Sequence, residues 1–216
     1  MSDRSGRRVL PRSFFDRPTL AVTRDLLGKV LVCRARGGLA SGMIVEAEAY
    51  IGESDPACHA APGPTRRNEP MYGEPGHAYV YLNYGVHNLM NVVTERRGHP
   101  AAVLIRALEP LEGPELMRLR RLAGRRRAGS TVADHDLCRG PGNLTCALGI
   151  TLAGNRADLT RAAAGRRAGL WIEDRGFEIA EVRWTPRIGI REGTELAWRC
   201  IAVRHPSVSG RRGAQR

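Results

Sequence analysis

Long apolar stretches are missing from this 216-residue sequence, and so is any pairing of cysteines at short spacing. No apolar run approaches the roughly 18 residues of a membrane-spanning helix, and the basic first residues are not followed by the apolar segment of a signal peptide. The five cysteines are scattered without a Cys-x-x-Cys pair, which argues against a structural zinc site. We therefore expect a cytoplasmic, soluble protein with reduced thiols and no membrane partner.

Lysine is almost absent: Lys29 is the single one, so the formal net charge of +12 comes almost entirely from arginine. Such a charge favours a polyanionic partner, with nucleic acid as the natural candidate. A coding bias towards arginine is an alternative explanation for part of it. The arginines at 118–127, 156, 161, 166 and 167 fit either phosphate contacts or an ordinary solvated face, and we expect 120–127 to form an exposed, partly mobile loop.

Length and composition predict one globular domain. With 42% hydrophobic residues, the chain can bury a core without disulfides or a structural metal. We place the domain at 12–206, between basic, poorly ordered ends at 1–11 and 207–216. Periodicity and turn residues predict helices at 18–27, 114–122 and 143–148, strands at 29–35, 43–50, 79–84, 89–93, 101–107 and 197–203, and a hairpin joining 170–173 to 177–184. The fold class is α+β: a curved, mostly antiparallel sheet flanked by helices.

Two carboxylates and a phenol share one face of the strand expected at 43–50. Glu46, Glu48 and Tyr50 alternate along it, and alternate residues of a strand project to the same side. An exposed strand face shows the same alternation, and spacing alone favours that simpler interpretation. A metal site built from Glu48, Asp55 and His59 has no His-x-x-x-His or Asp-x-Asp pattern to support it, so we expect no metal.

All five tyrosines fall within a 35-residue span, at 50, 72, 79, 81 and 84, although aromatic residues make up only 5% of the chain. Tyrosine packs well on strands, which explains any single one of them. Three of them between Tyr79 and Tyr84, beside a long loop at 52–77 that carries His59 and His77, favour a stacking surface. Base stacking on an aromatic face contributes about 1 to 3 kcal/mol per base, so a nucleobase suits this cluster.

A recognisable pattern begins with the same glutamates. The segment at 44–52, Ile-Val-Glu-Ala-Glu-Ala-Tyr-Ile-Gly, with Asp55 and His59 after it, closely resembles the alkyladenine (3-methyladenine) DNA glycosylases. Further segments agree in order, at 26–29, 65–68, 79–85, 104–113, 137–142 and 186–190. Taken together these segments are highly specific, and the resemblance spans about 12–206.

This resemblance implies both a fold and an activity. The fold is a single α+β domain similar to the C-terminal domain of methionyl-tRNA formyltransferase. The activity is base-excision repair: an alkylated purine is flipped out of damaged double-stranded DNA and its N-glycosidic bond is hydrolysed, which leaves an abasic site. Deaminated purines are a further, open substrate class. The resemblance also implies a monomer that uses no cofactor and no catalytic metal.

Residue roles follow from the resemblance by motif position. Glu48 resembles the general base that activates water, and Arg106 resembles the residue that helps to position this water. The walls of the base pocket are expected from three aromatic side chains, Tyr50, His59 and Tyr81.

Further positions concern the DNA itself. Asn91 is similar to the residue that screens bases at the pocket mouth, and Tyr84 to the side chain that fills the vacated place in the duplex. Two departures stand out, Tyr72 where relatives often have Phe and Asn143 where Lys is usual, and the second puts one backbone contact in doubt. The candidates for contact with the DNA backbone are Arg66, Arg67, Arg139 and Arg187.

The chemistry of the base and of the available amines gives two more expectations. Alkylation at N3 or N7 makes a purine cationic, and the rings of Tyr50 and Tyr81 would favour that cation by about 0.5 to 2 kcal/mol. Glycosylases that also cut the strand form a Schiff base through an amine. The only side-chain amine, Lys29, is not among the expected site residues, so we expect a monofunctional enzyme without lyase activity.

Three other functions remain open at this point. The main alternative is a non-catalytic nucleic-acid-binding protein that uses a basic surface and a tyrosine stacking platform. An RNA-directed enzyme or tRNA-binding module follows from the fold-level kinship, which is weaker evidence than site residues. A metal-dependent hydrolase is the most distant of the three.

Overall fold

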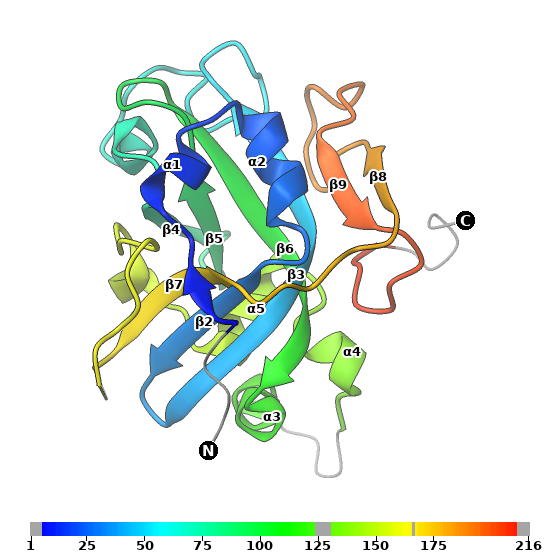
Figure 1. Cartoon of the computed structure of the whole chain (residues 1–216). Helices are drawn as coiled ribbons and strands as arrows, with labels where there is room; N and C mark the ends of the chain where they lie inside the picture. Colours follow the sequence, from blue (N-terminus) through cyan, green and yellow to red (C-terminus); the bar gives the residue numbers. More distant parts are fainter. Residues whose placement is uncertain (1–5, 124–130, 166, 211–216) are drawn as a thin grey trace.

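The computed structural model describes residues 6–123, 131–165 and 167–210, and its centre is one antiparallel sheet of nine strands. Seven strands follow the order β1-β7-β2-β3-β6-β5-β4, while β9 pairs with β3 and carries β8 beside it. Figure 1 shows the long strands β3 and β6 running side by side through the middle of a curled sheet. The prediction of a single domain with a curved antiparallel sheet is confirmed, and the similarity to the formyltransferase domain stays a prediction.

The elements have the following bounds. The strands are β1 (Arg8–Val9), β2 (Val30–Ala35), β3 (Gly38–Ile51), β4 (Ala78–Asn83), β5 (His87–Val93), β6 (Ala101–Glu112), β7 (Gly169–Asp174), β8 (Val182–Thr185) and β9 (Arg199–Ala202). The helices are α1 (Arg12–Phe15), α2 (Thr19–Leu26), α3 (Pro114–Leu122), α4 (Asp134–Leu137) and α5 (Pro141–Leu148), with 3-10 turns η1 (Glu69–Tyr72) and η2 (Leu152–Gly154). No helix in the described ranges is long and apolar enough to cross a membrane.

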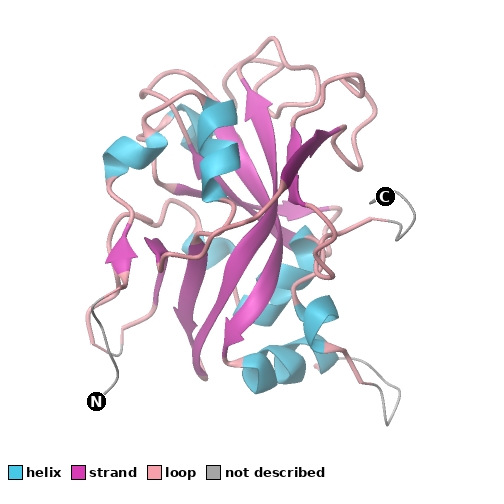
Figure 2. Cartoon of the chain, turned by 45° about the vertical axis from the view of Figure 1, so that its right-hand side comes forward, coloured by secondary structure: helices cyan, strands magenta, loops and turns pink. Residues whose placement is uncertain are grey.

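One apolar core joins the helices to the central strands. Ile44 of β3 and Ile105 of β6 are fully buried, and Leu26 of α2 and Leu144 of α5 belong to the same cluster. Figure 2 separates two helical groups near opposite ends of the sheet, α1 with α2 and α3 with α4 and α5. Residues of β4, β5 and β6 line a cavity, which is described below.

The pairing of β3 with β6 is irregular at one point. Ile44 lies opposite Leu108, Glu46 opposite Ala107 and Ala47 opposite Ile105, so the register skips a residue on each strand. One of the skipped residues is Arg106. Bulges of this kind locally bend a strand and re-aim a side chain, and they are common beside functional sites. The irregularity therefore falls at the arginine that the sequence places in the site.

The chain ends are more ordered than the sequence suggested. Arg8 and Val9 form β1 on the edge of β7, and Leu10 is buried. At the other end Ser207, Val208 and Ser209 are buried as well. The predicted poorly ordered ends are therefore wrong for 8–10 and 207–209, because both segments pack on the sheet, while 1–5 and 211–216 lie outside the described residues.

The predicted hairpin between 170–173 and 177–184 is also wrong. β7 pairs with β1 and β2, whereas β8 begins at Val182 and pairs with β9. Because β1 and β2 occupy both edges of β7, a returning strand finds no free edge there. The turn itself exists: Asp174 accepts a hydrogen bond from the backbone N–H of Gly176 at 2.9 Å, and the chain then leaves the strand.

Two arginines of the expected loop at 120–127 belong to the folded body. Arg120 donates to the carbonyl oxygen of Leu148 at 2.7 Å and of Ala147 at 3.1 Å, at the end of α5, where a cation satisfies unpaired carbonyls. Arg121 is buried and donates to the carbonyl oxygen of Leu137 at 2.6 Å. The exposed-loop prediction is wrong for these two residues, and 124–130 lie outside the described part of the chain.

Candidate active site

A row of side chains crosses five strands on one face of the sheet. Tyr79 of β4 lies opposite Asn91 of β5, and Asn91 lies opposite Leu104 of β6. Leu104 in turn lies opposite Glu48 of β3, which lies opposite Arg199 of β9. Directly opposed residues of antiparallel strands share a face. The register thus gathers residues from five separate stretches of sequence into one row.

A cavity of about 540 Å³ opens over this row. Its volume falls within the range of about 300 to 1,000 Å³ that small-molecule sites occupy. Strands β4, β5 and β6, the loop after β3 and the segment at 188–192 supply its walls. The predicted site residues that line it are Tyr50, His59, Tyr81, Tyr84, Asn91 and Arg106.

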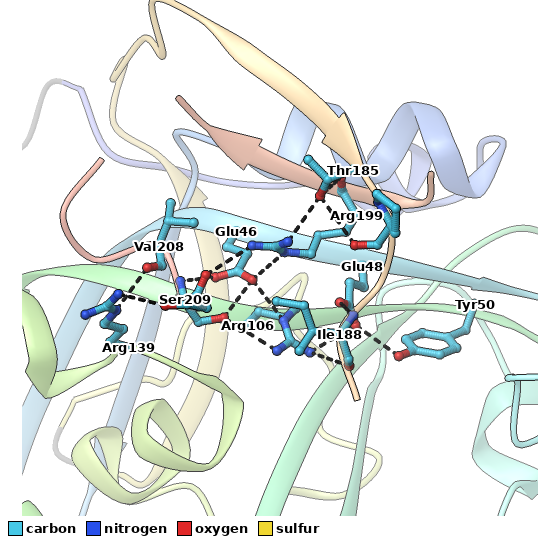
Figure 3. Close-up of polar contacts among 12 residues, drawn as sticks. Glu46, Glu48, Tyr50, Arg106, Arg139, Thr185, Ile188, Arg199, Val208 and Ser209 are labelled. Carbon is cyan, nitrogen blue, oxygen red and sulfur yellow. Dashed lines mark hydrogen bonds and ion pairs between the residues drawn. The ribbon is translucent and has the colours of Figure 1, made fainter. Parts of the chain in front are cut away.

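Glu48 lies directly beneath the floor of the cavity and has no exposed side-chain surface. Its Oε1 accepts the backbone N–H of Ile188 at 2.8 Å, and its Oε2 accepts Nη1 of Arg106 and the hydroxyl of Tyr50, each at 3.0 Å. Figure 3 shows these three donors converging on the carboxylate. All three belong to residues that line the cavity, so a single layer of residues separates Glu48 from it.

Glu46 is equally buried and lies further from the cavity. Its Oε1 accepts Nε of Arg106 at 2.9 Å and Nε of Arg199 at 2.7 Å, and its Oε2 accepts the backbone N–H of Ser209 at 2.6 Å. The Ser209 hydroxyl adds a fourth hydrogen bond, at 2.8 Å. The simpler interpretation of Glu46 and Glu48 as an exposed strand face is therefore wrong. The Arg106 and Arg199 side chains and the segments at Ile188 and Ser209 cover the two carboxylates.

The two carboxylates differ in their electrostatic surroundings. Burial opposes ionisation of Glu46, but Arg106, Arg199 and the donors of Ser209 outweigh it and lower the pKa of Glu46. At Glu48 burial dominates over Arg106, Ile188 and Tyr50, and the nearby Glu46 charge adds to it, so the pKa of Glu48 is raised. Glu48 is accordingly the better proton acceptor of the two when it is ionised.

Aromatic rings form the walls above this floor. The His59 and Tyr81 rings meet edge to face with centroids 4.5 Å apart, and the Tyr79 and Tyr81 rings lie 5.3 Å apart. His59 Nδ1 is 2.9 Å from the Tyr79 hydroxyl, which the sequence did not place among the pocket walls. Arginines lie over two of the rings, Arg67 over Tyr81 at 5.3 Å and Arg187 over Tyr50 at 4.8 Å.

The hairpin from β4 to β5 forms the rim. Asn91 lines the cavity and donates through Nδ2 to the carbonyl oxygen of Tyr79 at 3.1 Å. Tyr84, at the tip, is 88% exposed, and its φ of +47° is unusual for a residue with a side chain. Leu82 and Val86 on either side are exposed too. The tip therefore offers an aromatic ring and two apolar side chains to whatever approaches the cavity.

The four arginines expected on the DNA backbone have different surroundings. Arg66 and Arg67 are exposed, close to the cavity in the loop before η1. The Arg187 side chain is buried and forms a two-pronged ion pair with Asp55, at 2.6 and 2.8 Å, so its guanidinium is engaged within the protein. Arg139 donates to the carbonyl oxygens of Val208 and Gly210, so its guanidinium is largely engaged within the protein.

Other groups that the sequence raised are placed apart from the cavity floor. Lys29 forms an ion pair with Asp174 at 2.8 Å and is not among the residues lining the cavity. Asp55, which was considered with Glu48 and His59 for a metal site and not favoured, forms an ion pair with Arg187. Among the residues described, no group of three His, Cys, Asp or Glu side chains is placed to hold a metal ion.

Several contributors to the site had no sequence signal that identified them. Ile188 contributes through its backbone N–H, which every residue except proline possesses, although its segment is part of the matching motifs. Arg199 carries no local pattern, and its place follows only from the pairing of β9 with β3. Ser209 lies in a stretch rich in Gly, Ser and Arg that reads as a tail. Such contributions depend on tertiary contacts.

Comparison with known proteins now adds to the geometry. Residues 13–206 match the family described as methylpurine-DNA glycosylase (MPG). The chain belongs to this family. The resemblance found in the sequence motifs is thereby confirmed, and the family match covers every element from α2 to β9 and all of α1 except Arg12.

Similar proteins come from several microorganisms. A protein of Methanocella arvoryzae is 50% identical over 206 residues, which cover 94% of this chain and 96% of the relative. Relatives from Prosthecochloris aestuarii and Burkholderia lata are 45% and 46% identical, and cover 92% and 94% of this chain and 89% and 91% of the relatives. Each of the three bears the name "Putative 3-methyladenine DNA glycosylase".

His59 is predicted to stay neutral throughout the physiological range. Burial and the neighbouring Arg67 lower the pKa of His59 from its ordinary 6.5 to about 4. Because the unfolded chain then binds this proton more readily than the folded one, lowering the pH from 6.5 towards 4 lowers the free energy of unfolding. An NMR titration of the imidazole should give a midpoint near 4; a midpoint near 6.5 would mean that the ring is solvated and not part of a pocket wall.

Proposed function

We propose that this member of the methylpurine-DNA glycosylase family is a monomeric base-excision repair enzyme that hydrolyses the N-glycosidic bond of alkylated purines in double-stranded DNA. The family membership and the names of the relatives support the reaction class. The observation that carries the proposal is Glu48, a carboxylate with a raised pKa directly beneath a cavity walled by aromatic rings.

Water activation is the proposed task of Glu48. A carboxylate has about four lone-pair positions, and three donors occupy Glu48, which leaves one for a water molecule. This water would enter through the cavity floor between Tyr50 and Arg106, both of which line the cavity. Positive charge accumulates on the sugar as the glycosidic bond breaks, so the same carboxylate also stabilises the transition state.

Base flipping would bring the damaged nucleotide into the cavity. Drawing a base from the duplex costs a few kcal/mol, and less at a damaged pair. We infer that the Tyr84 ring, which is exposed at the hairpin tip, fills the gap and offsets that cost. Exposed Arg66 and Arg67 stay our candidates for contact with the DNA backbone.

The charge of the flipped base is the main open question of specificity. The rings of Tyr50 and Tyr81 favour a cationic purine. The Arg187 and Arg67 guanidinium groups over these same rings oppose a further cation. Neutral deaminated purines such as hypoxanthine are therefore a second substrate class worth testing. In their neutral form they meet no repulsion from the arginines, and a tight fit in the cavity would have to select them.

Glu48→Gln is expected to abolish excision while DNA binding persists, because the amide keeps the shape of the side chain but cannot accept a proton. Single-turnover release of free 3-methyladenine, with DNA affinity measured in parallel, tests this. Glu178→Gln, at an exposed carboxylate between β7 and β8, is the matched control and should match the wild type. Near-normal turnover by Glu48→Gln would remove Glu48 from its role.

Absence of release by the wild type itself would have a different meaning. If methylated DNA is bound in a salt-sensitive manner and no base is released, the non-catalytic nucleic-acid-binding function is favoured instead.

Tyr84→Ala should weaken capture of the flipped nucleotide more than binding to undamaged DNA, because only the flipped state leaves a gap to fill. A fluorescent adenine analogue placed at the lesion reports flipping, and a filter assay reports binding. Tyr84→Phe keeps the ring and should retain flipping. Equal losses by Tyr84→Ala in both assays would argue against insertion of this side chain into the duplex.

The strand is expected to stay intact after excision. A Schiff base needs an amine at the sugar, and the single lysine is held by Asp174 away from the cavity lining. Borohydride added during turnover should therefore trap no covalent protein–DNA adduct, with a known lyase as the positive control. A trapped adduct would contradict the monofunctional assignment.

A further inference from the structure

A second buried carboxylate sits behind the one that we assign to water activation. Glu46 has no exposed side-chain surface and is not among the residues lining the cavity. It nevertheless receives four hydrogen bonds, from Arg106, Arg199 and both donors of Ser209. Together with Glu48, the group consists of two carboxylates and two guanidinium groups, so its charges balance when all four are ionised.

Arg106 connects the two carboxylates. Its Nε donates to Glu46 at 2.9 Å and its Nη1 donates to Glu48 at 3.0 Å (Figure 3). A guanidinium is a rigid planar fork, so an anchor on Nε fixes the direction in which Nη1 points. Glu46 therefore sets both the orientation of Arg106 and how much of its charge is shared with Glu48.

The C-terminal segment at 207–210 covers Glu46 on the side away from the cavity; we call this contact the seal. The chain after β9 returns so that the backbone N–H of Ser209 reaches Glu46 and its carbonyl oxygen accepts Nη2 of Arg199 at 3.1 Å. Arg139 holds the same segment through the carbonyl oxygens of Val208 and Gly210. The family match ends at residue 206, so this seal lies beyond the matched region.

We propose that Glu46, sealed by Ser209, is a positioning residue whose permanent negative charge holds Arg106 away from exclusive pairing with Glu48 and so keeps Glu48 a strong base. This rests on the proposed function of Glu48. The charge of Glu46 contributes to the raised pKa of Glu48, in agreement with the geometry. Among the described residues, Arg106 of β6, Arg199 of β9 and Tyr50 of β3 donate hydrogen bonds to the pair. Arg187 and Tyr81 also interact electrostatically with Glu48.

Two substitutions have effects of opposite sign on Glu48. Glu46→Gln removes a negative neighbour and frees Arg106 to pair with Glu48 alone, so the pKa of Glu48 falls. Arg199→Gln removes a positive neighbour and makes Glu46 compete harder for Arg106, so the pKa of Glu48 rises. A merely structural role for either residue would change the amount of active protein, and it would not move the pH dependence in opposite directions.

The test is the pH profile of single-turnover excision of 3-methyladenine from duplex DNA, with DNA affinity measured on the same preparations. Glu46→Gln should shift the acidic limb to lower pH and reduce the plateau rate by at least about tenfold, because a weaker base activates water less well. Arg199→Gln should shift the acidic limb to higher pH. DNA affinity should change less than about twofold in both, since neither residue lines the cavity.

The proposal would be overturned if the acidic limbs of the two pH profiles do not move, or if both move in the same direction. A loss of rate that is explained by weaker DNA binding would also overturn it. If Glu46→Gln fails to fold, the direction of the shift in Arg199→Gln decides alone. Glu48→Gln, run in the same series, separates the two proposals. If Glu48→Gln turns over normally, the assignment of Glu48 fails. If Glu48→Gln is inactive and the other two variants have the wild-type profile, only the role of Glu46 fails.

Discussion

The Arg106 guanidinium, shared between two buried carboxylates, is the interaction on which the rest of the site depends. Taking charges out of water costs several kcal/mol per ion, and removing one partner of a buried pair typically destabilises a protein by about 3 to 5 kcal/mol. The protein meets this requirement with donors from β6, β9, the segment at 188 and the C-terminal segment. Four distant parts of the chain must therefore be in place before the carboxylates can be buried.

The same strand pairings therefore determine both the fold and the geometry of the site. The bulged pairing of β3 with β6 places Arg106 beside Glu46, and β9 adds Arg199 on the other side of β3. The same register carries the row onward through Leu104 and Asn91 to the tyrosines of β4. A shift of one strand by one residue would send its side chains to the opposite face and dismantle both the charge cluster and the cavity wall.

Much of this could be predicted from the sequence, and the reasons for the exceptions are physical. Alternation identified the shared face of Glu46, Glu48 and Tyr50, and the motifs identified the family. Alternation is identical for an exposed and a buried face. The burial of Glu46 and Glu48 depends on contacts with β6, β9, the segment at 188 and the C-terminal segment. The wrongly predicted hairpin after β7 has suitable turn residues, but both edges of β7 are already paired with β1 and β2. Which strand edges are free depends on the whole sheet and cannot be read from the local sequence.

Arginine content was a weaker guide than it first appeared. Part of the excess positive charge lies inside the fold: Arg120 satisfies the end of α5, Arg187 pairs with Asp55 and Arg121 is buried. The net charge favoured nucleic acid as the class of partner. It gave no information on which arginine side chains are exposed. Near the cavity, exposed arginines include Arg66 and Arg67 in the loop before η1 and Arg191, which lines the cavity.

The most direct test of the account is a carbon-13 NMR titration of the Glu46 and Glu48 carboxyl groups in the folded protein, assigned through Glu46→Gln and Glu48→Gln. The account predicts two separate titrations, with the Glu46 carboxyl midpoint below the ordinary 4.5 and the Glu48 carboxyl midpoint above it. If the order is reversed, or if Glu48 titrates like a solvated glutamate, the buried charge cluster does not make Glu48 the base.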